Sequence, residues 1–93
     1  MGRLADRVVV ITGSTGIAAA AAESAAAEGA RVFIISRDPD HARELADRVG
    51  GAWAAADLAD EPAVDAAIDA AVARFGRIDG LFAVAGGSGR RFG

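Results

Sequence analysis

Apolar residues along the chain gather in short blocks, and each block has the length of a β-strand. Val8-Val9-Val10-Ile11 is a continuous apolar run rather than an alternating one, which is typical of a strand buried on both faces. Comparable apolar runs recur three times further along the chain. The pattern therefore predicts strands over 7–12, 31–36, 52–56 and 81–85.

Helix-length segments separate these strands, and residues suited to helix ends stand at their boundaries. The sequence predicts helices over 16–28, 39–49 and 61–75. Asp38 and Asp60 stand where N-caps belong, and glycines follow each helix. Since short strands that alternate with helices form parallel sheets with right-handed crossovers, we expect an α/β fold. The expected order of elements along the chain is β-α-β-α-β-α-β, around a parallel sheet.

Composition narrows the class of protein. Ninety-three residues allow one domain at most, and 53% of them are hydrophobic even with glycine left out, against roughly 45–50% with glycine included in ordinary proteins. This excess fits either an alanine-rich α/β domain or a piece of a larger fold whose other half covers apolar surface. A net charge of −3 without a basic cluster argues against nucleic acid as a partner.

Several other classes are disfavoured by what the sequence lacks. No apolar run approaches the roughly 18 residues of a membrane span, and the first residues have no apolar core of a signal peptide, so we expect no membrane partner and a cytoplasmic location. The chain has no cysteine, which removes disulfides and thiolate chemistry, and no acidic cluster has metal-ligand spacing. His41, the only histidine, is expected at the surface of the second helix.

The turn between the first strand and the first helix carries candidate chemistry. Gly13 permits a tight turn, and Gly16 lets the backbone approach an anion without a Cβ in the way. Ser14 and Thr15 add hydroxyl donors, and the main-chain amides up to Ile17 face the same point at the positive end of the helix. Ala19 is small enough for the helix to pack closely on the sheet. No lysine follows, so this is not the loop of a nucleoside-triphosphatase; we expect it to bind the diphosphate of a dinucleotide.

The end of the second strand bears on which dinucleotide is bound. An acidic residue at this place usually contacts the ribose hydroxyls of NAD, whereas an arginine accommodates the extra phosphate of NADP. Here the small Ser36 precedes Arg37, whose guanidinium can form a forked pair with a phosphate. NADP is the expected cofactor. NAD stays open, because Asp38 next to Arg37 can serve a ribose.

Taken together, these features resemble the N-terminal part of the short-chain dehydrogenase/reductase family. The ordered residues that carry the resemblance are Thr12-Gly13-Ser14-Thr15-Gly16-Ile17, Glu28-Gly29-Ala30-Arg31-Val32, Asp57-Leu58, Phe75-Gly76-Arg77-Ile78-Asp79-Gly80-Leu81 and Ala85-Gly86. The resemblance implies a Rossmann-like parallel sheet, half of a doubly wound fold, and a nicotinamide cofactor. It implies that Asp57 hydrogen-bonds the adenine amino group and that Leu58 contacts the adenine. It also implies that Val84, Ala85 and Gly86 lie against the adenine-side ribose.

The sequence departs from the family pattern at three places. The glycine loop is one residue shorter than the common Thr-Gly-x-x-x-Gly-x-Gly, and Ala83-Val84 replace the usual pair of asparagines. The serine and the Tyr-x-x-x-Lys that serve catalysis in the family are absent, and the 93 residues contain neither tyrosine nor lysine. We therefore expect residues 1–93 to be a partial NAD(P)-binding domain, truncated at its C-terminus, with no catalytic residue of its own.

Three functions follow as hypotheses. The first is the cofactor-binding segment of an oxidoreductase that transfers hydride between nicotinamide and an alcohol or carbonyl, inactive as this chain alone. Its partners are the dinucleotide and, in a full-length protein, a small-molecule substrate and further copies of the same subunit. The second is a non-catalytic NAD(P)-binding or redox-sensing module. The third is an unrelated α/β interaction domain whose glycine loop is structural.

Overall fold

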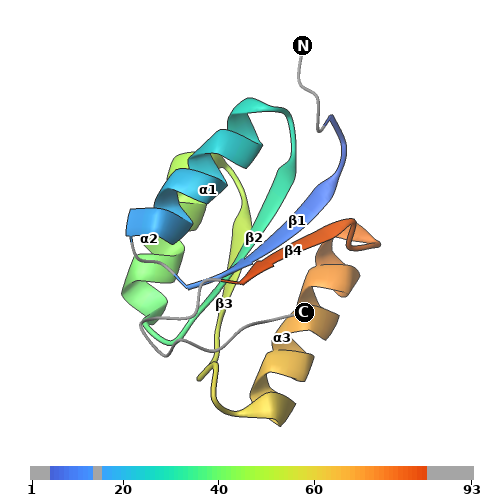
Figure 1. The fold of residues 1–93 in the computed structure, drawn as a ribbon. Coiled ribbons are helices and arrows are strands. Elements are labelled where there is room, and N and C mark those ends of the chain that lie inside the picture. The colour runs from blue at the N-terminus through green and yellow to red at the C-terminus, as the bar shows by residue number, and fades with distance from the viewer. Residues whose placement is uncertain (1–4, 14–15, 84–93) are drawn as a thin grey trace.

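The structure, a computed structural model, describes residues 5–13 and 16–83. Strands and helices alternate strictly along them (Figure 1). The elements are β1 (Val8–Thr12), α1 (Gly16–Ala27), β2 (Arg31–Ser36), α2 (Pro39–Val49), β3 (Ala52–Ala55), α3 (Glu61–Phe75) and β4 (Gly80–Ala83).

The four strands form one parallel sheet in the order β3-β2-β1-β4. Helices α1 and α2 lie on one face of the sheet and α3 covers the other (Figure 1). The predicted α/β class and the Rossmann-like parallel arrangement are thereby confirmed. Parallel strands end at the same edge of the sheet, so the segments that follow β1, β2 and β3 are neighbours in space.

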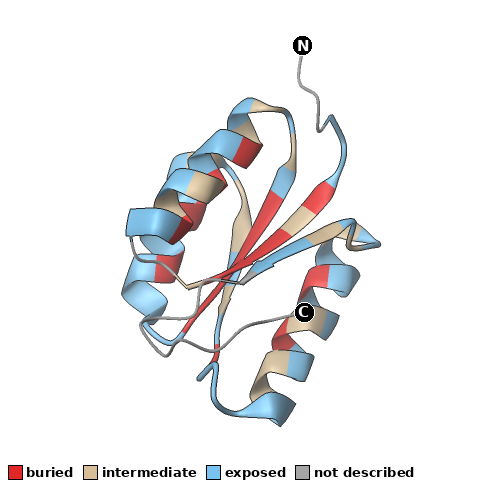
Figure 2. Ribbon diagram, viewed as in Figure 1, coloured by how far each residue is buried: buried red, intermediate tan, exposed pale blue. Residues whose placement is uncertain are grey.

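Sheet and helices enclose two layers of core, one on each face. The layer under α1 and α2 is built from Ile11, Val32 and Ile34 of the sheet with buried alanines of α1. The layer under α3 contains Val10, Phe33 and Ile35 together with alanines of that helix. Phe33 also meets Phe75 edge to face, with ring centroids 6.3 Å apart. The buried residues gather on β1, β2 and the inward faces of the helices (Figure 2).

The residues expected to cap helices do so. Asp38 and Asp60 have extended backbones and accept hydrogen bonds from main-chain N–H groups in the first turns of α2 and α3. Gly50 and Gly76 end those helices in the left-handed conformation, at φ of 68° and 89°. Because both ends of these helices are fixed by local chemistry, their bounds agree with the bounds predicted from sequence.

Small differences from the predicted bounds occur at the ends of other elements. The first strand begins at Val8 rather than residue 7, α1 ends at Ala27 rather than residue 28, and β3 ends at Ala55 rather than residue 56. β4 begins one residue earlier than predicted, at Gly80, and its predicted extension over 84–85 lies outside the described residues. Among the described helices, none is both long enough and apolar enough to cross a bilayer.

Candidate functional site

The predicted binding residues converge on the edge of the sheet where β1, β2 and β3 end. The glycine turn follows β1, the Ser36-Arg37 pair closes β2, and Asp57 and Leu58 follow β3. In open α/β sheets, ligands bind outside this carboxyl edge, at the point where the strand order reverses. Here the chain passes to one side of β1 to form β2 and β3 and returns to the other side to form β4. The end of β1 is therefore the reversal point.

Gly13 makes the turn that leaves β1. Its φ is +97°, a left-handed value that favours glycine over residues with a side chain. Its N–H donates to the carbonyl oxygen of Ile35 at 2.6 Å, which extends the pairing between β1 and β2 by one bond. The φ of Gly13 agrees with its expected place in a tight turn, but its N–H already donates to a carbonyl of the sheet. An anion would be bound by the amides that come after it.

Gly16 opens helix α1 and stands beside open space. A Cβ built on Gly16 would meet no heavy atom of the described residues within 4 Å. Ile17, the next residue, is 67% exposed. The first N–H groups of a helix have no partner within the helix, and the positive end of the helix dipole lies there, so the start of a helix is suited to an anion. Ser14 and Thr15, which complete the predicted loop, lie outside the described residues.

The alanines of α1 hold this helix end close to the sheet. Ala19, expected to allow close packing, is partly buried and packs against the core layer under α1 and α2. Ala18 is the residue of this turn with no exposed surface at all, and Ala22 repeats the arrangement one turn later. A larger side chain at Ala18 would push the helix away from β1 and β2, and its amides away from the carboxyl edge.

Ser36 and Arg37 have opposite surroundings although they are adjacent. Ser36 is 4% exposed, and its hydroxyl oxygen accepts a hydrogen bond from the N–H of Asp38 at 3.2 Å. Ser36 therefore shapes the turn into α2 instead of presenting its hydroxyl outward. Arg37 is exposed, and no ion pair joins its guanidinium to a described residue. It stands at the carboxyl edge with its charge uncompensated by a salt bridge.

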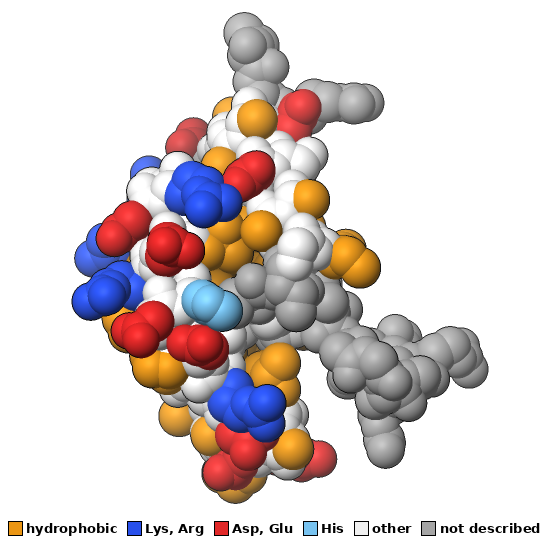
Figure 3. Space-filling view, turned by 90° about the vertical axis from the view of Figure 1, so that its left-hand side faces the viewer, with side chains coloured by type: hydrophobic (Ala, Val, Ile, Leu, Met, Phe, Trp, Pro, Cys, Tyr) orange, Lys and Arg blue, Asp and Glu red, His pale blue; other side chains and the backbone are white. Residues whose placement is uncertain are grey.

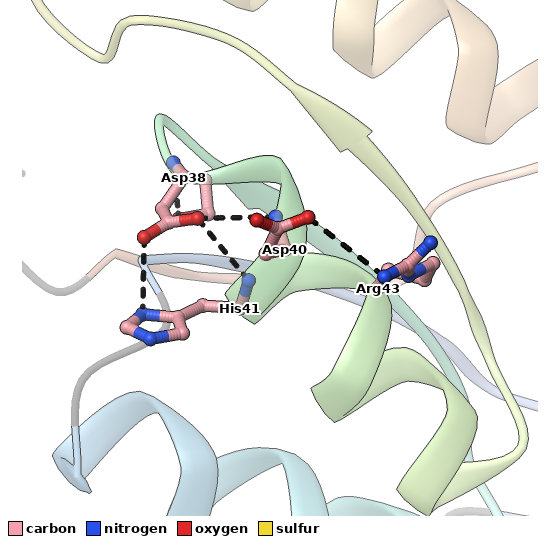
Figure 4. Close-up of polar contacts among 5 residues, drawn as sticks. Asp38, Asp40, His41 and Arg43 are labelled. Carbon is pink, nitrogen blue, oxygen red and sulfur yellow. Dashed lines mark hydrogen bonds and ion pairs between the residues drawn. The ribbon is translucent and has the colours of Figure 1, made fainter.

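Asp38 is the N-cap of α2, and its two oxygens have different partners (Figure 4). Oδ1 accepts the main-chain N–H groups of Asp40 at 3.0 Å and His41 at 3.3 Å. Oδ2 lies 3.4 Å from Nδ1 of the His41 ring. The sequence left Asp38 open as a ribose ligand; one of its oxygens is now seen to hold the helix start, and the other faces a histidine.

Asp57 and Leu58, the expected adenine contacts, follow β3 at the same edge. Asp57 is exposed, and its Oδ1 accepts the N–H of Ala59 at 3.0 Å, so the carboxylate also stabilises its own turn. Leu58 is 39% exposed. Asp60, and not Asp57, is the N-cap of α3, because its carboxylate accepts the N–H of Ala63.

The predicted ribose contacts Val84, Ala85 and Gly86 lie outside the described residues. The strand that leads to them is described, and Ala83 at its end pairs with Thr12 of β1. β4 therefore ends at the same edge as the glycine turn. Within the described ranges, no group of three or more histidines and acidic residues is placed to hold a metal ion.

The opposite edge of the sheet holds a polar cluster that the sequence marked only as part of a family motif. Asp79 Oδ2 accepts the N–H of Val8 at 2.8 Å and lies 2.9 Å from Nε of Arg77, and Asp79 returns its own N–H to the Val8 carbonyl at 2.8 Å. The Val8 N–H, and after it the charges of Arg77 and Arg7, hold the pKa of Asp79 below its usual value against an opposing effect of burial. This cluster fixes the starts of β1 and β4 together, far from the candidate site.

Comparison with known proteins agrees with this arrangement. The family model for short chain dehydrogenase matches residues 7–92. Among curated proteins, the chain is 41% identical over 90 residues to D-threitol dehydrogenase of Mycolicibacterium smegmatis, a match that covers 90% of this chain and 35% of that protein. It is 37% identical over 97 residues to levodione reductase of Leifsonia aquatica, covering 96% of this chain and 36% of the relative.

Solved structures give the same result. A 3-ketoacyl-(acyl-carrier-protein) reductase from Brucella melitensis, complexed with NADH, superposes with a TM-score of 0.81 at 37% identity, over 84% of this chain and 33% of that one. A levodione reductase structure gives 0.79 at 36% identity, over 85% and 34%. The chain thus spans about a third of the length of the relatives it matches. On its sequence match and its fold together, this chain belongs to the short-chain dehydrogenase family.

Proposed function

We propose that this chain is the cofactor-binding segment of an NADP-dependent short-chain oxidoreductase, with the hydride passing between nicotinamide and an alcohol or carbonyl substrate. The observation that carries the proposal is the left-handed turn at Gly13, followed by open space at Gly16, where α1 begins. The chemistry there is simple: main-chain amide donors, the positive end of a helix, and no side chain on Gly16. The NADH bound to the Brucella reductase supports a nicotinamide dinucleotide as the class of ligand.

The residues of the candidate site would bind the cofactor rather than break bonds. The first amides of α1 would hold the diphosphate, and Asp57 with Leu58 would receive the adenine at the neighbouring loop. The nicotinamide, when bound, supplies the hydride chemistry. These 93 residues contain no tyrosine or lysine to move the accompanying proton, so we place the acid/base group elsewhere in the protein.

Arg37 supports NADP over NAD. Its guanidinium is exposed at the end of β2 without an ion pair to any described residue, whereas the carboxylate of Asp38 is engaged in capping α2. A free guanidinium can take a phosphate in a forked pair, and a capping carboxylate is less available to a ribose.

Calorimetric titration of the 93-residue chain with NADPH and with NADH tests the proposal. We expect NADPH to bind more tightly, and Arg37→Ala to weaken NADPH by about tenfold or more while changing NADH by less than about threefold, because a charged hydrogen bond contributes roughly 1.5–3 kcal/mol. Arg31→Ala is the matched control, since Arg31 is also exposed but begins the same strand, at the opposite edge of the sheet. Equal binding of both cofactors by Arg37→Ala and the parent chain would contradict the NADP assignment.

The second candidate is a non-catalytic NAD(P)-binding or redox-sensing module. The two candidates separate on the coding sequence that follows codon 93. A Tyr-x-x-x-Lys motif in the same reading frame supports the oxidoreductase, and a stop codon directly after Gly93 supports the module.

A further inference from the structure

The turn between β2 and α2 combines one fixed cation, one carboxylate and one titratable ring within five residues. Arg37 is exposed without a described ion-pair partner, and Asp38 follows it as the helix cap. His41 reaches back from the first turn of α2 so that Nδ1 lies 3.4 Å from Asp38 Oδ2 (Figure 4). The side chains of His41 and Asp38 are 66% and 51% exposed, so a ligand can reach both.

The two oxygens of Asp38 are not equivalent. Oδ1 is held by the N–H groups of Asp40 and His41 and fixes the carboxylate in place. Oδ2 has the His41 ring as its partner and faces outward from the helix start. The charge at Oδ2 is therefore offset when the ring is protonated and uncompensated when the ring is neutral.

We infer that Asp38 and His41 make the choice between NADP and NAD depend on pH. The inference rests on the proposed function and concerns the adenosine ribose of the same cofactor. With His41 protonated, Asp38 is neutralised and Arg37 remains as a net positive charge for a 2′-phosphate. With His41 neutral, the carboxylate cancels Arg37, disfavours a phosphate, and offers Oδ2 to a ribose hydroxyl. Histidine is the side chain whose charge ordinarily changes between about pH 5 and 8.

Other charges near this turn do not replace the pair. Asp40 is matched by Arg43, at 3.8 Å. The first turn of α1, Gly16 to Ala19, carries no charged side chain, and Glu23 of that helix pairs with Arg48 at the far end of α2. Glu44 lies one turn further along α2, and Asp57, Asp60 and Glu61 stand beyond β3; none of them forms an ion pair with His41. Figure 3 shows the single histidine at the surface beside acidic side chains.

The test measures the dissociation constants of NADP⁺ and NAD⁺ for the full chain by calorimetry at several values from pH 5.5 to 8.5. A phosphate monoester loses its second proton near pH 6, so the ligand alone should strengthen NADP⁺ binding as pH rises. Deprotonation of His41 acts in the opposite direction. Relative to the rise that the ligand alone gives, we expect the preference of the parent chain for NADP⁺ to fall about threefold between pH 6 and 8, the size expected for one charge acting through hydrated surface.

Three variants make the outcome decisive. His41→Gln should lose the fall and leave only the rise due to the phosphate. Asp38→Asn, which keeps a good N-cap, should prefer NADP⁺ at every pH and also lose the fall. Arg43→Gln, which breaks the neighbouring pair on the same helix, should shift affinities evenly and keep the pH profile of the parent. Far-UV circular dichroism of each variant confirms that α2 remains folded.

The possible failures are distinguishable. Binding of both cofactors with one pH profile in the parent and in His41→Gln overturns this inference and leaves the proposed function in place. No binding of either cofactor at any pH overturns both.

Discussion

β2 and β4 are both short apolar strands of one parallel sheet, yet their surroundings differ completely. β2 has five consecutive buried residues, Val32 to Ser36, and strands on both sides. β4 is the outer strand beside β1, and its Leu81 and Phe82 are 58% and 44% exposed. Leucine and phenylalanine are as apolar as the residues of β2, so composition does not explain the difference. Position in the sheet does.

The surface beside β4 lacks the covering side chains that bury β2. An apolar groove of about 280 Å³ lies between α1 and the β1–β4 pair, and its lining residues are Val9, Ile11, Ala21, Ser24, Ala25, Glu28 and Phe82. The corresponding space over β2 is filled by the buried side chains of α1 and α2. The alanines of α1 bring it close to the sheet but cannot extend over β4. An apolar run therefore indicates which residues are suited to burial, and the rest of the fold decides which of them become buried.

The largest effect on stability is expected from Ile34→Ala in β2. Ile34 has no exposed surface and packs in the core layer under α1 and α2, next to Ile11. Removing buried methyl groups loses both transfer free energy and packing, which costs about 2–5 kcal/mol. Urea denaturation followed by circular dichroism should show a loss of this size in the free energy of unfolding.

Leu81→Ala in β4 is the control for that comparison. It removes a side chain of similar size from the same sheet, but one that is already more than half in water. We expect a change below about 1 kcal/mol, because little apolar area returns to solvent. Equal losses for the two variants would mean that β4 is covered in solution, and the contrast between the strands would fail.

A second, smaller effect on stability concerns the contacts of Asp79 that join the starts of β1 and β4. Asp79 accepts the Val8 N–H and pairs with Arg77, and its pKa is lowered by these contacts. A carboxyl whose pKa is lower in the folded state stabilises the fold above its usual pKa, 3.8, and this contribution is lost as pH falls through the lowered value. Asp79→Asn should therefore lower the urea midpoint at pH 7, and the gap to the parent should narrow as pH falls below 3.8 and through the lowered pKa.

Asp69→Asn provides the matched control for this titration. Asp69 is an exposed carboxylate on α3, away from the contact between β1 and β4. Its replacement should leave the urea midpoint nearly unchanged at each pH. A difference between Asp79→Asn and the parent that persists undiminished until the carboxyl of Asp79 is fully protonated would show that its charge is not what joins the two strands.

Most of the fold could be predicted from sequence because its signals are local. Continuous apolar runs marked β1 and β2, and Asp38, Asp60, Gly50 and Gly76 marked the helix ends through capping chemistry that acts within a few residues. The role of Asp79 could not be predicted in this way. Its partner Val8 is 71 residues away in the sequence, and no local sequence pattern indicates that the Asp79 side chain bonds to the neighbouring strand.

The candidate site was predictable in type but not in detail. The spacing of Gly13 and Gly16 predicted a turn with space for an anion, and the φ of Gly13 and the open side of Gly16 agree with it. Sequence did not show that the Gly13 amide is taken by Ile35 or that Ser36 is buried under the α2 cap. Both depend on how adjacent segments meet in three dimensions. The pairing of His41 with Asp38 has a local signal in the sequence, a histidine three residues after an N-cap.

The smallest expected effect on stability comes with a clear effect on association. The outer strand β4 carries exposed Leu81 and Phe82, and an exposed apolar strand at a sheet edge is a surface for pairing with another chain. We expect the 93-residue chain to self-associate, and Leu81→Thr to reduce this while changing the free energy of unfolding by no more than about 0.5 kcal/mol. Sedimentation velocity over a range of protein concentrations measures the association.

Val72→Thr, an equally polar change at a residue of α3 that is 41% exposed, is the control and should leave the sedimentation profile unaltered. If the parent chain remains a monomer at high concentration, the exposed side of β4 does not act as a pairing edge, and the contrast with β2 is one of burial alone.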